Sequence, residues 1–89
     1  QGSAYAQNAI GVFYDNGSGV AEDDAEAVKW YQQAADNGGL DAQNNLGYMY
    51  EVGAGISQDY EQALKWYRRA ADQGSLRAWF SSISVATMF

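Results

Sequence analysis

Apolar residues recur along the chain with the spacing of helices. In the first stretch they fall at i, i+3, i+4, i+7 and i+8, one face of a 3.6-residue helix: Ala6, Ala9, Ile10, Phe13 and Tyr14. A second stretch repeats this stripe with Ala42, Leu46, Met49 and Tyr50. Two more stripes share the period: Ala27, Trp30, Tyr31, Ala34 and Ala35, then Ala63, Trp66, Tyr67, Ala70 and Ala71. The pattern therefore predicts two pairs of amphipathic helices.

Local signals mark both ends of the second helix in each pair. An aspartate is followed three residues later by Glu or Gln, which is the spacing of a capping box: Asp23 with Glu26, and Asp59 with Gln62. Gly38 and Gly74 follow the last apolar position, where a left-handed residue commonly ends a helix. These signals predict where the second helices begin and end.

The whole pattern repeats after 36 residues. Aligning residues 2–37 with 38–73 gives 16 identities in 36 positions, and the same shift places VKWYQQAADNG at 28–38 against LKWYRRAADQG at 64–74. Repetition at a fixed spacing is typical of a structural unit stacked on its own copy, because one helical hairpin cannot bury its apolar face alone. We therefore predict a single domain over 1–89. It contains repeat one at 2–37, repeat two at 38–73, and a partial third repeat or capping helix at 74–89.

The last fifteen residues begin a third unit and then depart from it. Ile83 stands where a glycine is expected, and Ala86 where a tyrosine is expected. Apolar residues still keep helical spacing, which predicts a fifth helix that covers the end of the stack with Leu76, Trp79, Phe80 and Ile83. The alternative, a frayed or truncated terminus, stays open at this point. Because no charge follows Arg77, the outer face of this helix is also expected to favour self-association.

Two glycines stand inside the predicted first helices, at Gly11 and Gly47. Glycine costs about 1 kcal/mol relative to alanine in a helix interior. We expect close approach of the neighbouring helix to compensate, with Ala34 and Ala70 as the contacts. The G-x-G loops between the helices are predicted to be turns, because Glu22 and Gln58 stand where a dinucleotide fingerprint needs its third glycine.

The composition argues against several classes of function. The net charge of −6 argues against nucleic acid as a partner, since neutralising phosphates needs clustered Lys and Arg. The chain has no cysteine and no histidine, so disulfides, thiol chemistry and the commonest metal ligand and general base are absent. We expect no enzyme activity, cofactor or metal site. No apolar run approaches the roughly 18 residues of a transmembrane segment. No signal peptide is visible, and a first residue of Gln1 suggests a mature or trimmed form.

The repeated block is A-x-x-x-[IL]-G-x-x-Y-x-x-G-x-G-[VI] followed by A-[VL]-K-W-Y-x-x-A-A-D-x-G. It resembles the Sel-1-like repeat, a longer-looped relative of the tetratricopeptide repeat, over about residues 4–78. The resemblance implies an all-α fold, a right-handed α/α superhelix (solenoid) whose first helices line a concave groove. It also implies an adaptor role without catalytic residues. Many bacterial members are exported, so an exported or periplasmic location becomes an expectation.

By this resemblance, the residues of the first helices outside the core stripe face the groove and bind the partner: Tyr5, Asn8, Val12, Asp15, Asp41, Asn44, Tyr48, Glu51, Arg77 and Phe80. Asn8 and Asn44 are equivalent, and no core argument requires asparagine there. A side-chain amide can pair with the N–H and C=O of a bound peptide. The acids of this set favour a basic partner. The alternative, a solvated polar face, stays equally open.

Two functions follow from these observations. The first is a non-enzymatic scaffold or adaptor that binds another protein or peptide in the groove. The alternative is a structural subunit or fragment of a larger assembly, which packs through its repeat ends and has no groove ligand. An enzyme ranks behind both, because the sequence offers no isolated polar triad.

Overall fold

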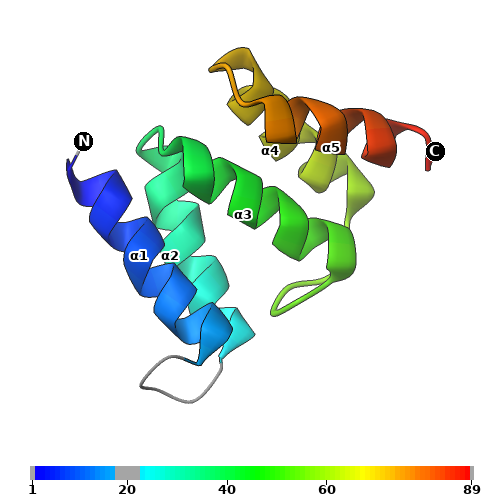
Figure 1. Cartoon of the computed structure of the whole chain (residues 1–89). Helices are drawn as coiled ribbons and strands as arrows, with labels where there is room; N and C mark the ends of the chain where they lie inside the picture. Colours follow the sequence, from blue (N-terminus) through cyan, green and yellow to red (C-terminus); the bar gives the residue numbers. More distant parts are fainter. Residues whose placement is uncertain (1, 18–22, 89) are drawn as a thin grey trace.

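The computed structural model describes residues 2–17 and 23–88, and it is a stack of helical hairpins (Figure 1). Its helices are α1 (Gly2–Asn16), α2 (Asp24–Asp36), α3 (Leu40–Val52), α4 (Tyr60–Asp72) and α5 (Leu76–Ala86). The first helices α1, α3 and α5 lie in front, and the second helices α2 and α4 lie behind them (Figure 1). No strand occurs within the described ranges. The predicted all-α solenoid is confirmed.

The predicted helix ends are present. The side chain of Asp23 accepts the backbone N–H of Glu26 at 3.0 Å, and Asp59 accepts that of Gln62 at 3.1 Å. Gly38 and Gly74, which follow α2 and α4, have φ values of +86° and +103°. Glycine adopts this left-handed region without a Cβ penalty, so the chain can reverse into the next first helix. Of the first G-x-G loop, residues 18–22 lie outside the described residues.

The core crosses the repeat boundary. One buried cluster joins side chains of α2 and α3 with Trp66 of α4: Ala27, Val28, Tyr31, Ala34, Ala35, Ala42, Leu46, Met49 and Trp66. A second cluster joins α4 and α5 through Ala63, Tyr67, Ala70, Ala78 and Val85. Each second helix therefore packs against the first helix of the following unit. This arrangement explains why the repeat is needed twice, since neither hairpin completes a core alone.

The two copies of the helical stripe are not buried equally. Phe13 of α1 is 53% exposed, whereas the equivalent Met49 of α3 is 1% exposed because α2 covers it. Trp30 is likewise only half-buried, whereas Trp66 is 4% exposed. The repeat places Phe13 and Trp30 at the same stripe positions as Met49 and Trp66, but only the residues of repeat two are buried. Within the described ranges, α1 and α2 have a neighbouring hairpin on one side, that of α3 and α4, whereas Met49 and Trp66 lie at the contact between the two hairpins.

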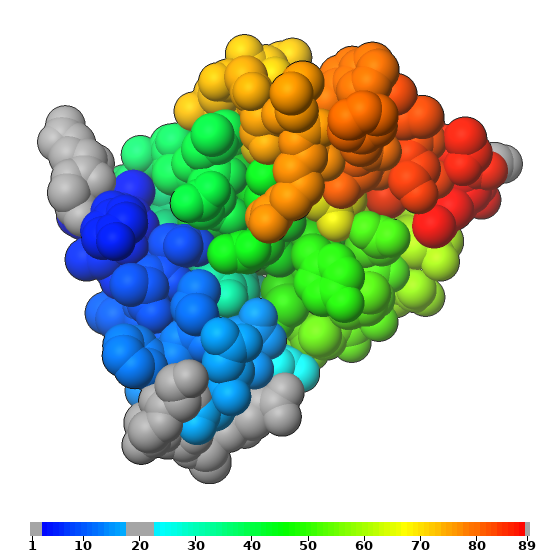
Figure 2. Space-filling view, viewed as in Figure 1, coloured from blue at the N-terminus to red at the C-terminus, as the bar shows by residue number. Residues whose placement is uncertain are grey.

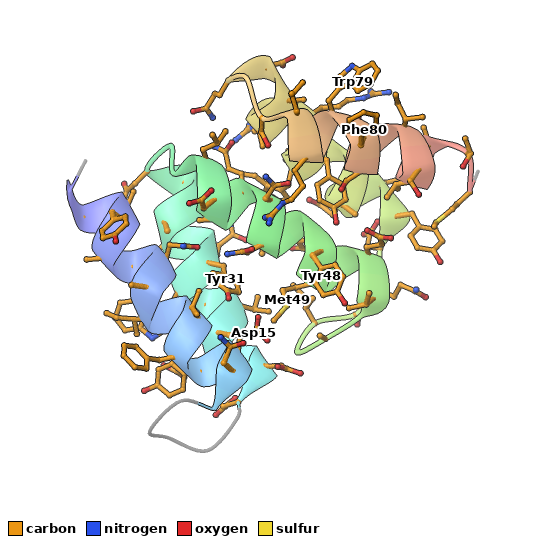
Figure 3. The ribbon with its side chains drawn as sticks, viewed as in Figure 1. Asp15, Tyr31, Tyr48, Met49, Trp79 and Phe80 are labelled. Atoms are coloured by element: carbon orange, nitrogen blue, oxygen red, sulfur yellow. The ribbon has the colours of Figure 1, made fainter. Side chains whose placement is uncertain are left out.

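The fifth helix is confirmed, but its predicted inner face was wrong. Its large apolar residues are exposed: Leu76 by 73%, Trp79 by 50%, Phe80 by 64% and Ile83 by 46%. The residues buried against α4 are Ala78 and Val85. Small residues at the contact let two helices approach closely, so α5 packs on its small-residue side and leaves its bulky side outward. Trp79 and Phe80 stack edge to face there, with ring centroids 5.1 Å apart (Figure 3).

The helix-interior glycines make room for tyrosine rings. A Cβ added to Gly47 would lie 2.8 Å from the Cε1 atom of Tyr67, and one on Gly11 would lie 2.6 Å from Tyr31. Both distances are shorter than carbon atoms tolerate. The predicted close approach is thus confirmed, but the contacts are the two tyrosines rather than Ala34 and Ala70. Each glycine fits a tyrosine of its own repeat.

We expect Gly47→Ala to lower the free energy of unfolding by about 1–3 kcal/mol, as overpacking does. The sign is informative, because alanine alone should favour the helix by about 1 kcal/mol. Thermal and urea unfolding measure the change. In a Tyr67→Leu background, which removes the ring, the same substitution should become neutral or stabilising. A destabilisation of equal size in both backgrounds would contradict the glycine–tyrosine contact.

Candidate functional site

The combined surface of α1, α3 and α5 is called here the first-helix face. Hollows open along it (Figure 2). One hollow of about 330 Å³ lies between α1 and the turn before α3, and is lined by Ala4, Tyr5, Asn8, Asn37, Gly38, Gly39, Leu40, Asp41 and Ala42. A second of about 350 Å³ follows α1 along Tyr5, Asn8, Ala9, Val12 and Phe13. A third of about 340 Å³ lies between α3 and α5, with Asn44, Asn45, Tyr48, Tyr67, Arg77 and Ser81 around it.

The structure brings most of the predicted partner-binding residues to these hollows. Seven of them are lining residues: Tyr5, Asn8, Val12, Asp41, Asn44, Tyr48 and Arg77. Among these, Tyr5 is 80% exposed and Tyr48 is 56% exposed. Phe80 lies apart, beside Trp79 on the bulky side of α5. Asp15 and Glu51 line none of the three hollows.

Asp15 and Glu51 accept hydrogen bonds from tyrosines of their own repeats. The Tyr31 hydroxyl donates to Asp15 at 3.1 Å, and the Tyr67 hydroxyl donates to Glu51 at 2.8 Å. Burial, together with the neighbouring carboxylate, raises the pKa of both phenols well above its ordinary value. Both tyrosines therefore stay protonated donors near neutral pH. The paired acids join the two helices of each hairpin, which is a structural role that the sequence did not reveal.

The equivalent asparagines also make structural hydrogen bonds, and they make different ones. Asn8 Oδ1 accepts from Asn45 Nδ2 at 3.0 Å, which links repeat one to repeat two. Asn44 is only 4% exposed, and its Nδ2 donates to Ser75 Oγ at 3.0 Å. Ser75 in turn caps α5 by accepting the Ala78 N–H at 3.1 Å. The interpretation that no core argument requires asparagine at these positions was wrong.

Other residues of the hollows escaped the sequence analysis. Asn45 and Ser81 line the hollow between α3 and α5. The hydrogen bond of Asn45 joins residues 37 positions apart, one more than the repeat period, so the alignment of equivalent positions hides it. A signal did exist: Asn45 replaces the apolar Ala9 of repeat one. A polar residue that replaces an apolar one in a repeated stripe indicates a new hydrogen bond.

Charge is unevenly distributed over the first-helix face. The sequences of α1, α3 and α5 contain three acids, Asp15, Asp41 and Glu51. They contain one base, Arg77, near the start of α5. The other four Lys and Arg residues are on α2 and α4. The face is therefore acidic beside α1 and α3, and its cation lies at the α5 end.

The described residues contain no group of three or more His, Cys, Asp or Glu placed to hold a metal ion. In the same ranges, every helix falls short of the length and apolar character needed to cross a bilayer.

Comparison with known proteins now identifies the family. A profile described as the Sel1 repeat matches residues 4–39 and 40–75. The chain belongs to the Sel1 repeat family. The profile places its two Sel1 repeats two residues later than our alignment of 2–37 with 38–73, at the same 36-residue period. No curated protein matched the sequence.

Solved structures of Sel1 repeat proteins have the same fold. A Sel1 repeat protein from Oxalobacter formigenes is 46% identical, with a TM-score of 0.87 over 89% of this chain and 32% of its own. The protective antigen c5321 of uropathogenic Escherichia coli is 47% identical, with a TM-score of 0.81 over 84% of this chain and 16% of its own. Helicobacter pylori cysteine rich protein B is 31% identical, with a TM-score of 0.83 over 86% of this chain and 58% of its own. This chain thus spans less than two thirds of each relative.

Proposed function

We propose that this Sel1 repeat domain is a non-enzymatic adaptor that binds a segment of another protein on its first-helix face. Sel1 repeats are generally protein–protein interaction modules, and proteins built from them are typically non-enzymatic scaffolds. The observation that carries the proposal is the pair of exposed tyrosines, Tyr5 and Tyr48, at the edges of the hollows. Neither hydroxyl has a hydrogen-bond partner among the described residues. Aromatic rings of this kind are enriched among the residues that dominate binding energy.

The charge of the first-helix face favours a partner with basic side chains. Asp41 lines the hollow beside α1, and neither α1 nor α3 carries a Lys or Arg to oppose its charge. A basic side chain of the partner would therefore be attracted to this part of the face, with a faster encounter. Salt should weaken that preference, because exposed charges are screened beyond roughly 8 Å at physiological ionic strength.

The test is binding of a defined set of 12-residue peptides, with basic, neutral and acidic members, measured by fluorescence anisotropy. Tyr5→Ser combined with Tyr48→Ser should weaken the binding of the peptides that bind the parent at least about tenfold, since the complex loses two aromatic contacts. Basic members should bind more tightly than neutral ones, and less so in high salt. Because both tyrosines are exposed, the double variant should keep the melting temperature of the parent.

Leu76→Ser is the matched control. Leu76 is 73% exposed, a value between those of Tyr48 and Tyr5, but it lines none of the three hollows. The control should bind peptides as the parent does. Peptide binding that survives the double tyrosine variant, or that depends on Leu76, would contradict binding on the first-helix face.

The alternative function, an assembly subunit that packs through its ends, is favoured by one observation. The bulky side of α5 exposes Leu76, Trp79, Phe80 and Ile83 and carries no charged residue after Arg77. Ile83 also stands where α1 and α3 have the glycines that admit a tyrosine ring. The second helix of a third unit, with a tyrosine at the equivalent position, would therefore collide with Ile83. A second copy that meets this side through its own α5, which carries no acidic residue, keeps the acids of two chains of charge −6 apart.

A further inference from the structure

The hollow between α3 and α5 contains an unusual set of polar groups. Arg77 brings a guanidinium, Tyr48 and Ser81 bring hydroxyls, and Asn44 and Asn45 bring amides. Arg77 is exposed, and among the described residues it forms no ion pair within 4.0 Å. It is also the single Lys or Arg in the sequences of α1, α3 and α5. The hollow is thus the one part of the first-helix face with an available cation.

Asn44 supplies a second, independent observation. Its side chain is 4% exposed and its Nδ2 atom is held by Ser75, yet its Oδ1 atom is buried without a hydrogen-bond partner. Buried acceptors are normally paired, so an unpaired one calls for a donor. Ser75 cannot easily release the amide, because its Oγ atom also caps α5. The unpaired oxygen thus belongs to a buried side chain of a residue that lines the hollow.

We propose that this hollow takes a carboxylate of the partner polypeptide together with a neighbouring N–H group. The Arg77 guanidinium pairs with the carboxylate in the fork geometry that arginine favours. The hydroxyls of Tyr48 and Ser81 donate to the same carboxylate, and Asn44 Oδ1 accepts the N–H. The proposal rests on the proposed function, since it names what the partner presents at the α5 end of the face.

The charges on the first-helix face then determine the orientation in which the partner segment binds. A basic group of the partner belongs beside α1 and α3, near Asp41, and an acidic group belongs beside Arg77. Glu51 opposes the acidic group, because it accepts the hydroxyl of Tyr67, which lines the same hollow. Two sources of carboxylate fit this chemistry: the end of a chain, and an Asp or Glu side chain.

The experiment titrates the full ¹⁵N-labelled chain with small probes at constant ionic strength and follows backbone amide and arginine side-chain NMR signals. N-acetylglycine represents a chain end, N-acetylaspartate N′-methylamide represents a side chain, and N-acetylglycine N′-methylamide is the uncharged control. We expect one or both acids to shift the signals of Tyr48, Arg77 and Ser81 saturably, while the uncharged probe does not. The acid that binds more tightly identifies the source of the carboxylate.

Variants separate this site from general attraction to cations. Arg77→Gln should weaken binding of the acid probes at least about tenfold, as loss of a charge-assisted hydrogen bond does. Arg68→Gln, which removes an exposed arginine of α4 outside the hollow, should leave binding unchanged. Glu51→Gln should tighten it, because one opposing charge is removed.

The possible results distinguish this inference from the proposed function. Equal binding of charged and uncharged probes, or shifts that follow Arg68 rather than Arg77, would overturn the carboxylate site. If the 12-residue peptides still required Tyr5 and Tyr48 while Arg77→Gln had no effect on either peptides or probes, the adaptor function would stand and the carboxylate site would fall. Saturable acid binding at Arg77 without any peptide binding would support the site and count against the adaptor function.

Discussion

Trp66→Ala is expected to lower the free energy of unfolding by about 3–5 kcal/mol, the range for a large buried aromatic residue. Trp66 is 4% exposed and belongs to the cluster that joins the two repeats. The guanidinium of Arg69 and the ammonium of Lys65 lie 4.9 and 5.8 Å from its ring centroid and add cation–π attraction. The substitution leaves a cavity between the repeats, so urea and thermal unfolding should show a large loss.

Trp30→Ala is the matched control, because it removes the same side chain from the equivalent position of repeat one. Trp30 is half-buried, and its Nε1 atom is shielded without an acceptor. Removing it also removes that unpaired donor, so we expect a cost of no more than about 2 kcal/mol. Equal costs at Trp30 and Trp66 would contradict the conclusion that the preceding repeat determines burial.

Deletion of residues 75–89 is expected to abolish cooperative unfolding of the rest of the chain. The deletion removes Ala78 and Val85, which cover the second cluster of the core, and it exposes the side of α4 on which they pack. It also removes Ser75, the partner of the buried Asn44 side chain. A solenoid of two hairpins with an uncovered end falls below the roughly three repeats that such folds need for stability. Circular dichroism during urea titration measures the loss.

Point substitutions in α5 separate its two sides without deleting it. Val85→Ala, on the side buried against α4, should cost about 2 kcal/mol. Trp79→Gln with Phe80→Gln, on the bulky side, should leave the monomer stable. Sedimentation equilibrium of parent and double variant then tests the alternative function. A parent dimer that the double variant dissociates would support assembly through α5, and a monomeric parent would reject it.

Much of the fold follows from the sequence because its signals are local. Helical periodicity predicted the helices, and Asp23 and Asp59 predicted where the second helices begin, since a cap involves residues only three apart. Gly38 and Gly74 predicted the reversals because a left-handed turn depends on the residue itself. The 36-residue repeat predicted the stack and led to the family. A repeated sequence carries the same local information twice, so chance agreement between the copies is small.

The tertiary structure alone decided how deeply equivalent positions are buried and which side of α5 faces the core. Phe13 and Met49 have equivalent positions, yet only Met49 has a hairpin packed against it. On α5, helical spacing could not tell the bulky side from the small-residue side, and close packing on α4 selected Ala78 and Val85. The candidate site depended on the same distinction. Asn44 and Glu51 looked like free groove residues until Ser75 and Tyr67, 31 and 16 positions away, appeared as their hydrogen-bond partners. Burial and hydrogen bonding are properties of neighbours in space, and a repeat holds equivalent positions whose neighbours differ at each end of the stack.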